Sequence, residues 1–225
     1  MGVQLNISKN TFVVFDLDDT LYKELSYVQS AFKEISQKIA DQNAEKCYHS
    51  MMIDFERGKN VFDCLINKYG NQEFTIKSLL NQYRNHFPNI KLDIGIDELI
   101  TGIHTKARGL GLITDGRSLT QRNKINALGI SKYFDSIVIS EEFGSEKPNE
   151  ANYLFFEQKY VSADFTYIGD NTEKDFIAPN KLGWDSICIL DSGTNIHHQN
   201  LELDQIYLPK RYVSNALEIE IIVEE

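Results

Sequence analysis

The chain has 225 residues, of which 42% are hydrophobic and 25% are charged, and its formal net charge is −10. This length allows one sizeable core or a core with a smaller inserted domain, and the composition is that of an ordinary globular protein. The negative charge argues against nucleic acid as a partner, because that affinity is built from clustered lysine and arginine side chains. A small-molecule partner is expected instead.

The cysteines and the first residues of the chain bear on its compartment. Cys47, Cys64 and Cys188 form no close pair, so neither a disulfide framework nor a zinc site is indicated. The N-terminal residues lack a basic start followed by an apolar run, and no stretch reaches membrane-spanning length. We therefore expect a cytoplasmic protein without a membrane partner, while the oligomeric state stays open.

The stretch FVVFDLDDTLY, residues 12–22, combines a short apolar run with three aspartates. The run from Phe12 to Phe15 predicts a strand that is buried on both faces of a parallel sheet. Asp16, Asp18 and Asp19 follow at once, and three like charges so close together are costly unless a cation lies between them. Two of these carboxylates can divide the work, one as metal ligand and nucleophile and the other as proton donor and acceptor. The alternative is a strand that ends in a solvated acidic turn.

After the first motif the apolar residues recur at helical spacing, at Leu25, Val28, Phe32, Ile35 and Ile39. Further helices are predicted over residues 44–55, 61–69 and 75–87, with breaks at Gly58, Gly70 and Pro88. Residues 22–92 therefore predict an all-helical insert. The remaining residues, 1–21 and 93–225, form the predicted core.

From Leu92 onward the chain alternates strand and helix. Strands are predicted over residues 111–114, 136–140, 165–169 and 186–190, and helices over 118–128, 148–160 and 173–182. After Asp191 the pattern is weaker, with a short strand at 205–208 and a helix from Ser214. This alternation predicts the α/β class, with a Rossmann-like, doubly wound parallel sheet whose ligands bind beyond the carboxyl ends of the strands.

A second polar cluster, Thr114, Asp115 and Gly116, closes one of these predicted strands. The threonine hydroxyl and the exposed backbone N–H groups before a helix would suit a phosphate. The alternative is that Ser118 only caps the next helix and that Thr114 is an ordinary sheet residue.

A third cluster contains Lys147, which precedes Pro148. Proline suits the first turn of a helix and favours an extended conformation for the residue before it, so the ammonium group of Lys147 could point at the sheet end. The alternative is a solvated surface lysine.

A fourth cluster follows the strand that ends at Gly169. Asp170 could complete an oxygen-ligand site with Asp16, as magnesium prefers. Asp175 lies farther along, and with Thr172 it has the spacing of a helix capping box, which is a structural alternative to a role in the site.

These four clusters, in this order, resemble the motifs of the haloacid dehalogenase-like (HAD) superfamily of hydrolases. The family's DxDx[TV] is similar to residues 16–20, its strand-terminal threonine or serine to Thr114, its lysine to Lys147, and its GDxxxxD to residues 169–175. The resemblance covers residues 11–190. The helical insert matches the family's cap domain in position and length but carries no motif of its own.

The resemblance implies a role for each residue. Asp16 would be the nucleophile that becomes phosphorylated, and Asp18 would protonate the leaving group and then activate water. Asp16, the backbone carbonyl of Asp18 and the carboxylate of Asp170 would hold Mg²⁺.

The same resemblance implies the phosphate site. Thr114, the N–H groups of Asp115 and Gly116, and Lys147 would bind the phosphoryl oxygens. Asp175 would lie behind them and orient Lys147 or metal-bound water.

The implied activity is that of a magnesium-dependent phosphatase, a phosphoric monoester hydrolase acting on a small phosphorylated metabolite through a phosphoaspartyl intermediate. The dehalogenase branch lacks the second aspartate of the first motif, so Asp18 points to phosphoryl transfer. A phosphosugar mutase of the same superfamily shares all four motifs and stays open, as does contact of Arg117 with the leaving group. A receiver-like phosphoryl-binding signalling module is the alternative from another class, but its aspartates would be too far apart in the chain and the cap would be unexplained.

Overall fold

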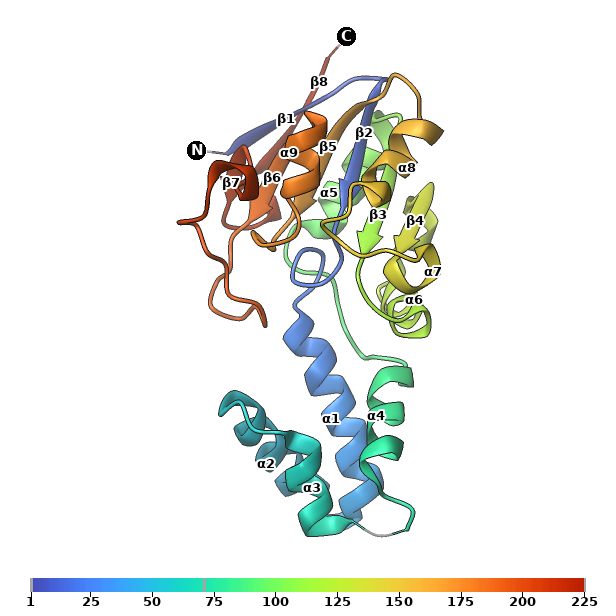
Figure 1. The fold of residues 1–225 in the computed structure, drawn as a ribbon, viewed down its shortest axis with the longest axis vertical. Coiled ribbons are helices and arrows are strands. Elements are labelled where there is room, and N and C mark those ends of the chain that lie inside the picture. The colour runs from blue at the N-terminus through green and yellow to red at the C-terminus, as the bar shows by residue number, and fades with distance from the viewer. Residues whose placement is uncertain (1, 71, 225) are drawn as a thin grey trace.

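The computed structural model describes residues 2–70 and 72–224, and a six-stranded parallel sheet forms its centre (Figure 1). The strand order is β4-β3-β2-β5-β6-β7, and every neighbouring pair is parallel. The strands are β2 (Thr11–Phe15), β3 (Gly109–Thr114), β4 (Ser136–Ile139), β5 (Asp164–Gly169), β6 (Asp185–Ile189) and β7 (Arg211–Val213). The predicted α/β fold with a doubly wound parallel sheet is confirmed.

Strand β2 is covered on both faces, as its apolar run predicted. Val13 and Phe15 pack into one hydrophobic cluster together with helices α5 (Ile96–Lys106) and α6 (Ser118–Ala127). Phe12 and Val14 pack into a second cluster on the other face, with helices α8 (Ala151–Lys159) and α9 (Ile177–Leu182). A short helix, α7 (Ser140–Phe143), follows β4. Successive side chains of a strand point to opposite faces, so a strand between two helical layers must be apolar throughout.

Two predicted helices begin later in the structure than in the sequence pattern. Helix α8 begins at Ala151, so Pro148 is not in its first turn, and the Lys147–Pro148 peptide bond is cis. Helix α9 begins at Ile177, because the residues before it form a loop that is tied by the carboxylate of Asp175.

The C-terminal part differs from the prediction. Residues 205–208 are not a strand but contain a 3₁₀-helix, η3 (Gln205–Tyr207). The helix predicted from Ser214 is also wrong: a 3₁₀-helix, η4 (Ala216–Glu218), leads into strand β8 (Ile219–Val223), which pairs in parallel with strand β1 (Val3–Ile7). The β-branched residues of 219–223 favour a strand, but their partner comes from the other end of the chain.

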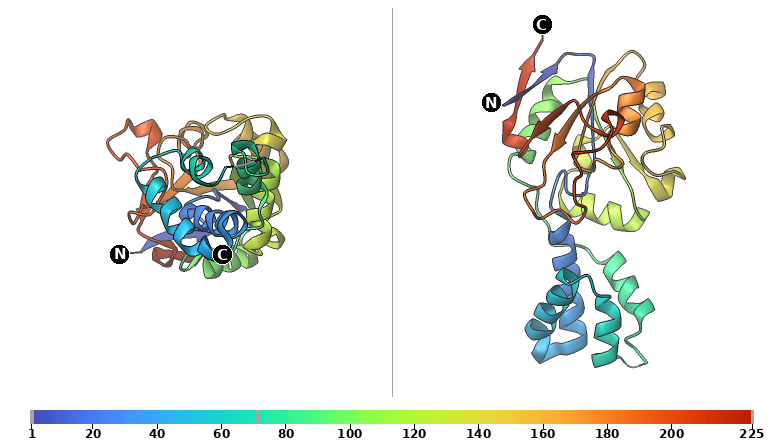
Figure 2. Two further views of the ribbon diagram at one scale, coloured as in Figure 1. Left: turned by 90° about the horizontal axis from the view of Figure 1, so that it is seen from below. Right: turned by 60° about the vertical axis from the view of Figure 1, so that its left-hand side comes forward.

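Four helices lie beyond the carboxyl ends of the strands, apart from the sheet (Figures 1 and 2). They are α1 (Glu24–Ala40), α2 (Ala44–Glu56), α3 (Val61–Tyr69) and α4 (Ile76–Asn85), close to the predicted ranges. They share a hydrophobic cluster of their own, which includes Phe32, Met51 and Leu79. The boundaries of the two domains, 22–92 for the cap and 1–21 with 93–225 for the core, stay a prediction. None of the helices in the described residues has the length and apolarity needed to cross a bilayer.

Candidate active site

Asp16 lies at the centre of the site. It directly follows β2, which has β3 on one side and β5 on the other. Its backbone N–H donates to the carbonyl of Ile168 on β5 at 2.9 Å, which extends the sheet pairing by one residue. Its side chain is buried, with Oδ1 accepting a hydrogen bond from Lys147 Nζ and Oδ2 accepting one from the hydroxyl of Thr20 at 3.3 Å. The first-motif aspartate therefore does not lie in a solvated turn.

Lys147 is buried between two carboxylates and is not a surface lysine. Besides Asp16, its Nζ donates to Oδ1 of Asp175 at 2.7 Å, and the hydroxyl of Tyr167 lies at 3.4 Å. Burial alone would lower the pKa of the Lys147 ammonium, but the charges of Asp16 and Asp175 outweigh it and hold that pKa well above its usual range. Lys147 is therefore a fixed positive charge beside the proposed nucleophile.

Asp175 is held by four donors. Its Oδ1 accepts from Lys147 and from the Tyr167 hydroxyl at 3.2 Å, and its Oδ2 accepts from the backbone N–H groups of Asp170 at 3.1 Å and Asn171 at 2.9 Å. This close approach needs Gly169, since a Cβ there would lie 2.5 Å from Oδ2. A carboxylate has about four acceptor positions, so Asp175 has no spare one for a metal ion.

The capping box considered for this segment does not form. The Thr172 hydroxyl accepts the backbone N–H of Asn200 at 3.0 Å, and the Asp175 carboxylate is used by the loop before it. The structure thus places Asp175 against Lys147, and its role in orienting that lysine stays a prediction.

Asp16, Asp170 and Asp175 form a buried carboxylate cluster in which one oxygen of each lies within 4.8 Å of the others. The Thr20 hydroxyl lies 3.3 Å from Oδ1 of Asp170 as well as from Oδ2 of Asp16, so the two carboxylates share its one proton. Oδ2 of Asp170 accepts a 2.9 Å hydrogen bond from Asn195 Nδ2. Burial, together with the neighbouring carboxylates, raises the pKa of Asp16 and of Asp170 well above the usual range. A divalent cation would offset this repulsion, and Asp16 and Asp170 keep acceptor positions free for it.

Asp18 points to a different set of partners. Its Oδ1 accepts hydrogen bonds from the Tyr22 hydroxyl and from Lys124 Nζ, the latter at 2.7 Å, and its Oδ2 accepts from Gln121 Nε2 at 2.8 Å. Burial raises the pKa of Asp18, but the charge of Lys124 and these hydrogen bonds outweigh it, and the pKa falls below its usual value. The Asp18 carboxylate is outside the buried cluster, so its predicted metal contact depends on its backbone carbonyl.

The second motif closes β3 beside β2. The buried Thr114 hydroxyl accepts from Gln121, and Oδ1 of Asp115 accepts the backbone N–H of Lys147 at 3.0 Å, which joins the second and third motifs. Gly116, at φ 141°, donates its N–H to the Ser140 hydroxyl at 2.9 Å, so binding of a phosphate there would have to replace this bond. The phosphate roles of Thr114, Asp115 and Gly116 stay predictions.

Ser118 does not cap helix α6, which was the structural alternative for this polar cluster. The residue at the N-cap of α6 is Arg117, and it makes no side-chain cap. Ser118 instead donates its hydroxyl to Glu142 at 2.6 Å. Arg117 itself is exposed and does not line the cavity described next.

A cavity of about 120 Å³ opens at these strand ends. It brings together the residues of all four motifs with side chains that the sequence did not single out. The lining residues are Asp16, Asp18, Asp19, Glu24, Thr114, Asp115, Lys147, Asp170, Asn171, Lys174 and His197.

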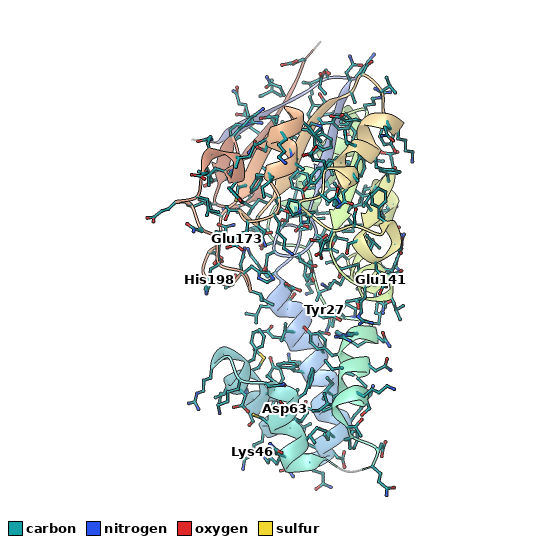
Figure 3. The ribbon with its side chains drawn as sticks, viewed as in Figure 1. Tyr27, Lys46, Asp63, Glu141, Glu173 and His198 are labelled. Carbon is teal, nitrogen blue, oxygen red and sulfur yellow. The ribbon has the colours of Figure 1, made fainter. Side chains whose placement is uncertain are left out.

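The loop of residues 191–200 forms part of this site, which the sequence did not predict. Asn195 donates to Asp170 and accepts a 3.0 Å hydrogen bond from Lys23 Nζ, while the backbone N–H of Ile196 donates to Asp19 at 3.0 Å. The loop also brings His197 to the cavity, and the neighbouring His198 is labelled in Figure 3. The only local signal was Asp191, whose side chain accepts three backbone N–H groups and shapes the turn.

Asp19, the third acidic residue of the first motif, has a structural role. It adopts a left-handed conformation with φ 58°, and its carboxylate accepts the backbone N–H of Glu24 at 2.9 Å as well as that of Ile196. It thus fastens the first turn of α1 and the 191–200 loop to the same point.

Known proteins resemble this chain along most of its length. The profile of the family described as haloacid dehalogenase-like hydrolase matches residues 13–189. The glyceraldehyde 3-phosphate phosphatase of Methanocaldococcus jannaschii is 30% identical over 198 residues, which cover 79% of this chain and 84% of the relative. The pyrimidine 5'-nucleotidase YjjG of Escherichia coli is 26% identical over 225 residues, covering 93% and 96% of the two chains.

Solved structures share the fold at lower identity. The magnesium-bound HAD-hydrolase YfnB of Bacillus subtilis has a TM-score of 0.64 at 19% identity and covers 94% of this chain and 97% of its own. A β-phosphoglucomutase-like protein of Thermotoga maritima has a TM-score of 0.63 at 16% identity, with coverage of 92% and 96%. At these identities the likeness concerns the fold.

Proposed function

This chain belongs to the haloacid dehalogenase-like hydrolases, as a phosphoric monoester hydrolase, and we propose that it cleaves a small phosphorylated metabolite through a phosphoaspartyl intermediate at Asp16. The observation that carries the proposal is the environment of the Asp16 carboxylate. It is buried at the end of the central strand, with Lys147 on one oxygen and Asp170 beside it in one carboxylate cluster. An ordinary structural ion pair would not need a third buried carboxylate next to it.

Each residue has a defined task in the proposed reaction. A carboxylate oxygen of Asp16 attacks the phosphorus, and Lys147 offsets the negative charge that the phosphoryl oxygens bring to the site. The pKa of Asp18 is low in the free site, and the negative charge of the bound phosphate raises it, so that Asp18 carries a proton at this stage. It gives this proton to the departing alkoxide as the ester bond breaks. A water molecule then attacks the acyl phosphate, Asp18 takes up its proton, and the bond between phosphorus and Asp16 breaks.

The donor set fits Mg²⁺. Asp16 and Asp170 are buried carboxylates with free acceptor positions, and oxygen ligands of this kind are those that magnesium prefers. The backbone carbonyl of Asp18 would complete the protein's share, and Asp175 would act through Lys147. When bound, the ion supplies positive charge that lets carboxylates and a phosphate share one pocket.

The cavity favours a short, neutral leaving group. Its lining contains six carboxylates and two lysines, so a substrate with a second negative group would be repelled even after a divalent cation binds. Within the described residues no phenylalanine, tyrosine or tryptophan lines it, and His197 offers the one small ring on which a nucleotide base could stack. Among the relatives, the one named glyceraldehyde 3-phosphate phosphatase fits this description better than the one named pyrimidine 5'-nucleotidase. We infer a hydroxylated monophosphate of the size of a triose.

The test is phosphate release with Mg²⁺ across a panel, with Asp16→Asn as the blank. The panel contains glyceraldehyde 3-phosphate, glycerol 3-phosphate, phosphoglycolate, 3-phosphoglycerate, uridine monophosphate and a phosphopeptide. The first two should be hydrolysed with the highest kcat/KM. Absence of release from every ester would overturn the proposed function, and a preference for phosphoglycolate or 3-phosphoglycerate would overturn the inference about charge.

A further inference from the structure

Lys124, on helix α6, is a buried lysine that none of the four motifs explains. Its side chain is 3% exposed, and its Nζ lies 2.7 Å from Oδ1 of Asp18 and 3.6 Å from a carboxylate oxygen of Glu24. The ammonium also lies over the ring of Tyr27, 4.6 Å from its centroid. Figure 3 shows Tyr27 at the junction between the helical bundle and the sheet. The turn after β2 and the first residues of α1 therefore meet helix α6 at this one charge.

Stability alone is a weak explanation for Lys124. A buried ion pair is often no more stable than well-packed apolar side chains of the same volume, since both charges lose their hydration. What a buried ion pair with hydrogen bonds does supply is a fixed geometry. The question is therefore which geometry Lys124 fixes.

The hydrogen bonds of Asp18 answer this question. Lys124 and the Tyr22 hydroxyl both donate to Oδ1, while among the residues that the structure describes Gln121 alone donates to Oδ2, at 2.8 Å. A carboxylate oxygen has about two acceptor positions, so Oδ1 is filled and Oδ2 keeps one free. Gln121 also donates to the hydroxyl of Thr114, which places Oδ2 on the side of the predicted phosphate site.

We propose that Lys124 is a positioning residue for Asp18: it holds Oδ1, so that Oδ2 is the oxygen presented to the reacting groups. The inference rests on the proposed function. In the first step the proton on Oδ2 passes to the leaving-group oxygen as its bond to phosphorus breaks. In the second step Oδ2 accepts a proton from the water that attacks the acyl phosphate, which restores the starting state.

Two neighbours of Lys124 on α6 bind the end of α4 and hold Lys124 in place. Thr120 donates its hydroxyl to the carbonyl of Arg84 at 2.8 Å, and Asn123 Nδ2 donates to the carbonyls of Asn85 at 3.2 Å and His86 at 3.1 Å. These carbonyls lie at the end of α4, where a helix leaves carbonyl groups without partners. Helix α6 is thus fastened to the bundle by residues next to Lys124, while Lys124 itself reaches Asp18.

The test compares Lys124→Met with Lys181→Met on two esters. Methionine keeps the unbranched stem and removes the charge, and Lys181 is a matched control because it pairs with Glu150 in an exposed ion pair on α9. Glycerol 3-phosphate has a leaving group that needs a proton, whereas nitrophenyl phosphate does not. General acid catalysis typically contributes about 10²–10⁴-fold, so loss of orientation in Lys124→Met should lower kcat for glycerol 3-phosphate by about 10- to 100-fold. KM should change little, and the release of nitrophenolate in the first turnover should be as fast as in the wild type.

Two further variants separate positioning from folding. Lys124→Arg should recover part of the kcat for glycerol 3-phosphate. In the double variant, Lys124→Met should add little to the loss of kcat that Asp18→Asn causes alone, because both changes act through the Asp18 carboxyl group. Equal losses on both esters in the first turnover, or multiplied losses in the double variant, would overturn the proposal. If Lys124→Met does not fold, Tyr22→Phe removes the other donor to Oδ1 and keeps the ring, and the same selective loss is required of it. Wild-type protein without phosphatase activity would instead refute the proposed function.

Discussion

Replacing Asp175 by asparagine should destabilise the protein far more than a one-atom change suggests. The side chain of Asp175 is fully buried, and each of its oxygens accepts two hydrogen bonds. An asparagine has one acceptor oxygen and one donor NH₂ group. If the NH₂ replaces Oδ1, it faces Lys147 and Tyr167; if it replaces Oδ2, it faces two backbone N–H groups.

In the second orientation two buried N–H donors lose their acceptor, and in the first Lys147 loses one of its two carboxylate partners. Each donor without an acceptor costs about 1–3 kcal/mol, so two cost about 2–6 kcal/mol, and breaking a buried ion pair costs about 3–5 kcal/mol. We therefore expect Asp175→Asn to lower the free energy of unfolding by about 3–5 kcal/mol. For a chain of this size, each kcal/mol lowers the melting temperature by roughly 2–4 °C. The expected fall is therefore roughly 6–20 °C.

The assay is thermal unfolding followed by circular dichroism, with Asp164→Asn as the matched control. Asp164 is exposed at the opposite end of the same strand, β5, and its replacement should leave the melting temperature nearly unchanged. A fall of less than about 3 °C in Asp175→Asn, equivalent to roughly 1 kcal/mol, would refute the four-donor account of this carboxylate.

Three other predictions concern the metal and the charges around it. Removing Mg²⁺ with a chelator should abolish phosphate release, and Ca²⁺ should inhibit it, because the looser coordination of Ca²⁺ would misplace Asp16. Full activity after chelation, or with Ca²⁺ alone, would contradict the proposed metal site. Asn195→Ala removes a hydrogen bond to Asp170 and should raise the Mg²⁺ concentration needed for half-maximal activity by about 10- to 100-fold. A titration of activity against Mg²⁺ measures this midpoint, and an unchanged midpoint would exclude a role for the 191–200 loop in metal binding. Burial, together with the charge of Asp18, raises the pKa of Glu24 from 4.5 to about 7, so its stabilising contribution is full below pH 4.5 and is lost as the pH rises to about 7. The melting temperature of Glu24→Gln relative to wild type should therefore increase between pH 5 and pH 8, and a difference that does not vary with pH would contradict this assignment.

The parts of the site that the sequence predicted are those in which a strand is followed at once by its polar residues. The apolar runs that become β2, β3 and β5 each end in such a cluster, and parallel strands bring their carboxyl ends to one edge. The strand pattern was therefore enough to predict that Asp16 and Asp170 lie together, whereas Lys147, which follows none of these strands, was assigned to the site by the family resemblance.

The partners of Asp18 could not be predicted in the same way. Gln121 and Lys124 lie 103 and 106 residues from it in the chain, on a helix whose sequence has no distinct apolar face. A lysine with a long aliphatic stem is usually a surface residue, and only the arrival of Glu24 and Tyr27 from the bundle makes it a buried one.

The segment after β6 was also beyond the sequence pattern. The pattern is weak after Asp191, and the contacts of this segment with Asp170 and Asp19 depend on where β5 and β2 end in space. Strand β8 was mistaken for helix for a similar reason, since its partner β1 lies at the opposite end of the chain.

The most direct test of the proposed mechanism is the first turnover of nitrophenyl phosphate by Asp18→Asn and Asp16→Asn, measured by rapid mixing. Nitrophenolate leaves without a proton, so Asp18→Asn should still phosphorylate Asp16 and release nitrophenolate in a burst that approaches the active-site concentration. Turnover should then be slow, because the same residue activates the water. Asp16→Asn should show no burst. A burst from Asp16→Asn, or silence from both variants while the wild type is active, would contradict the assignment of Asp16 as nucleophile and Asp18 as proton donor.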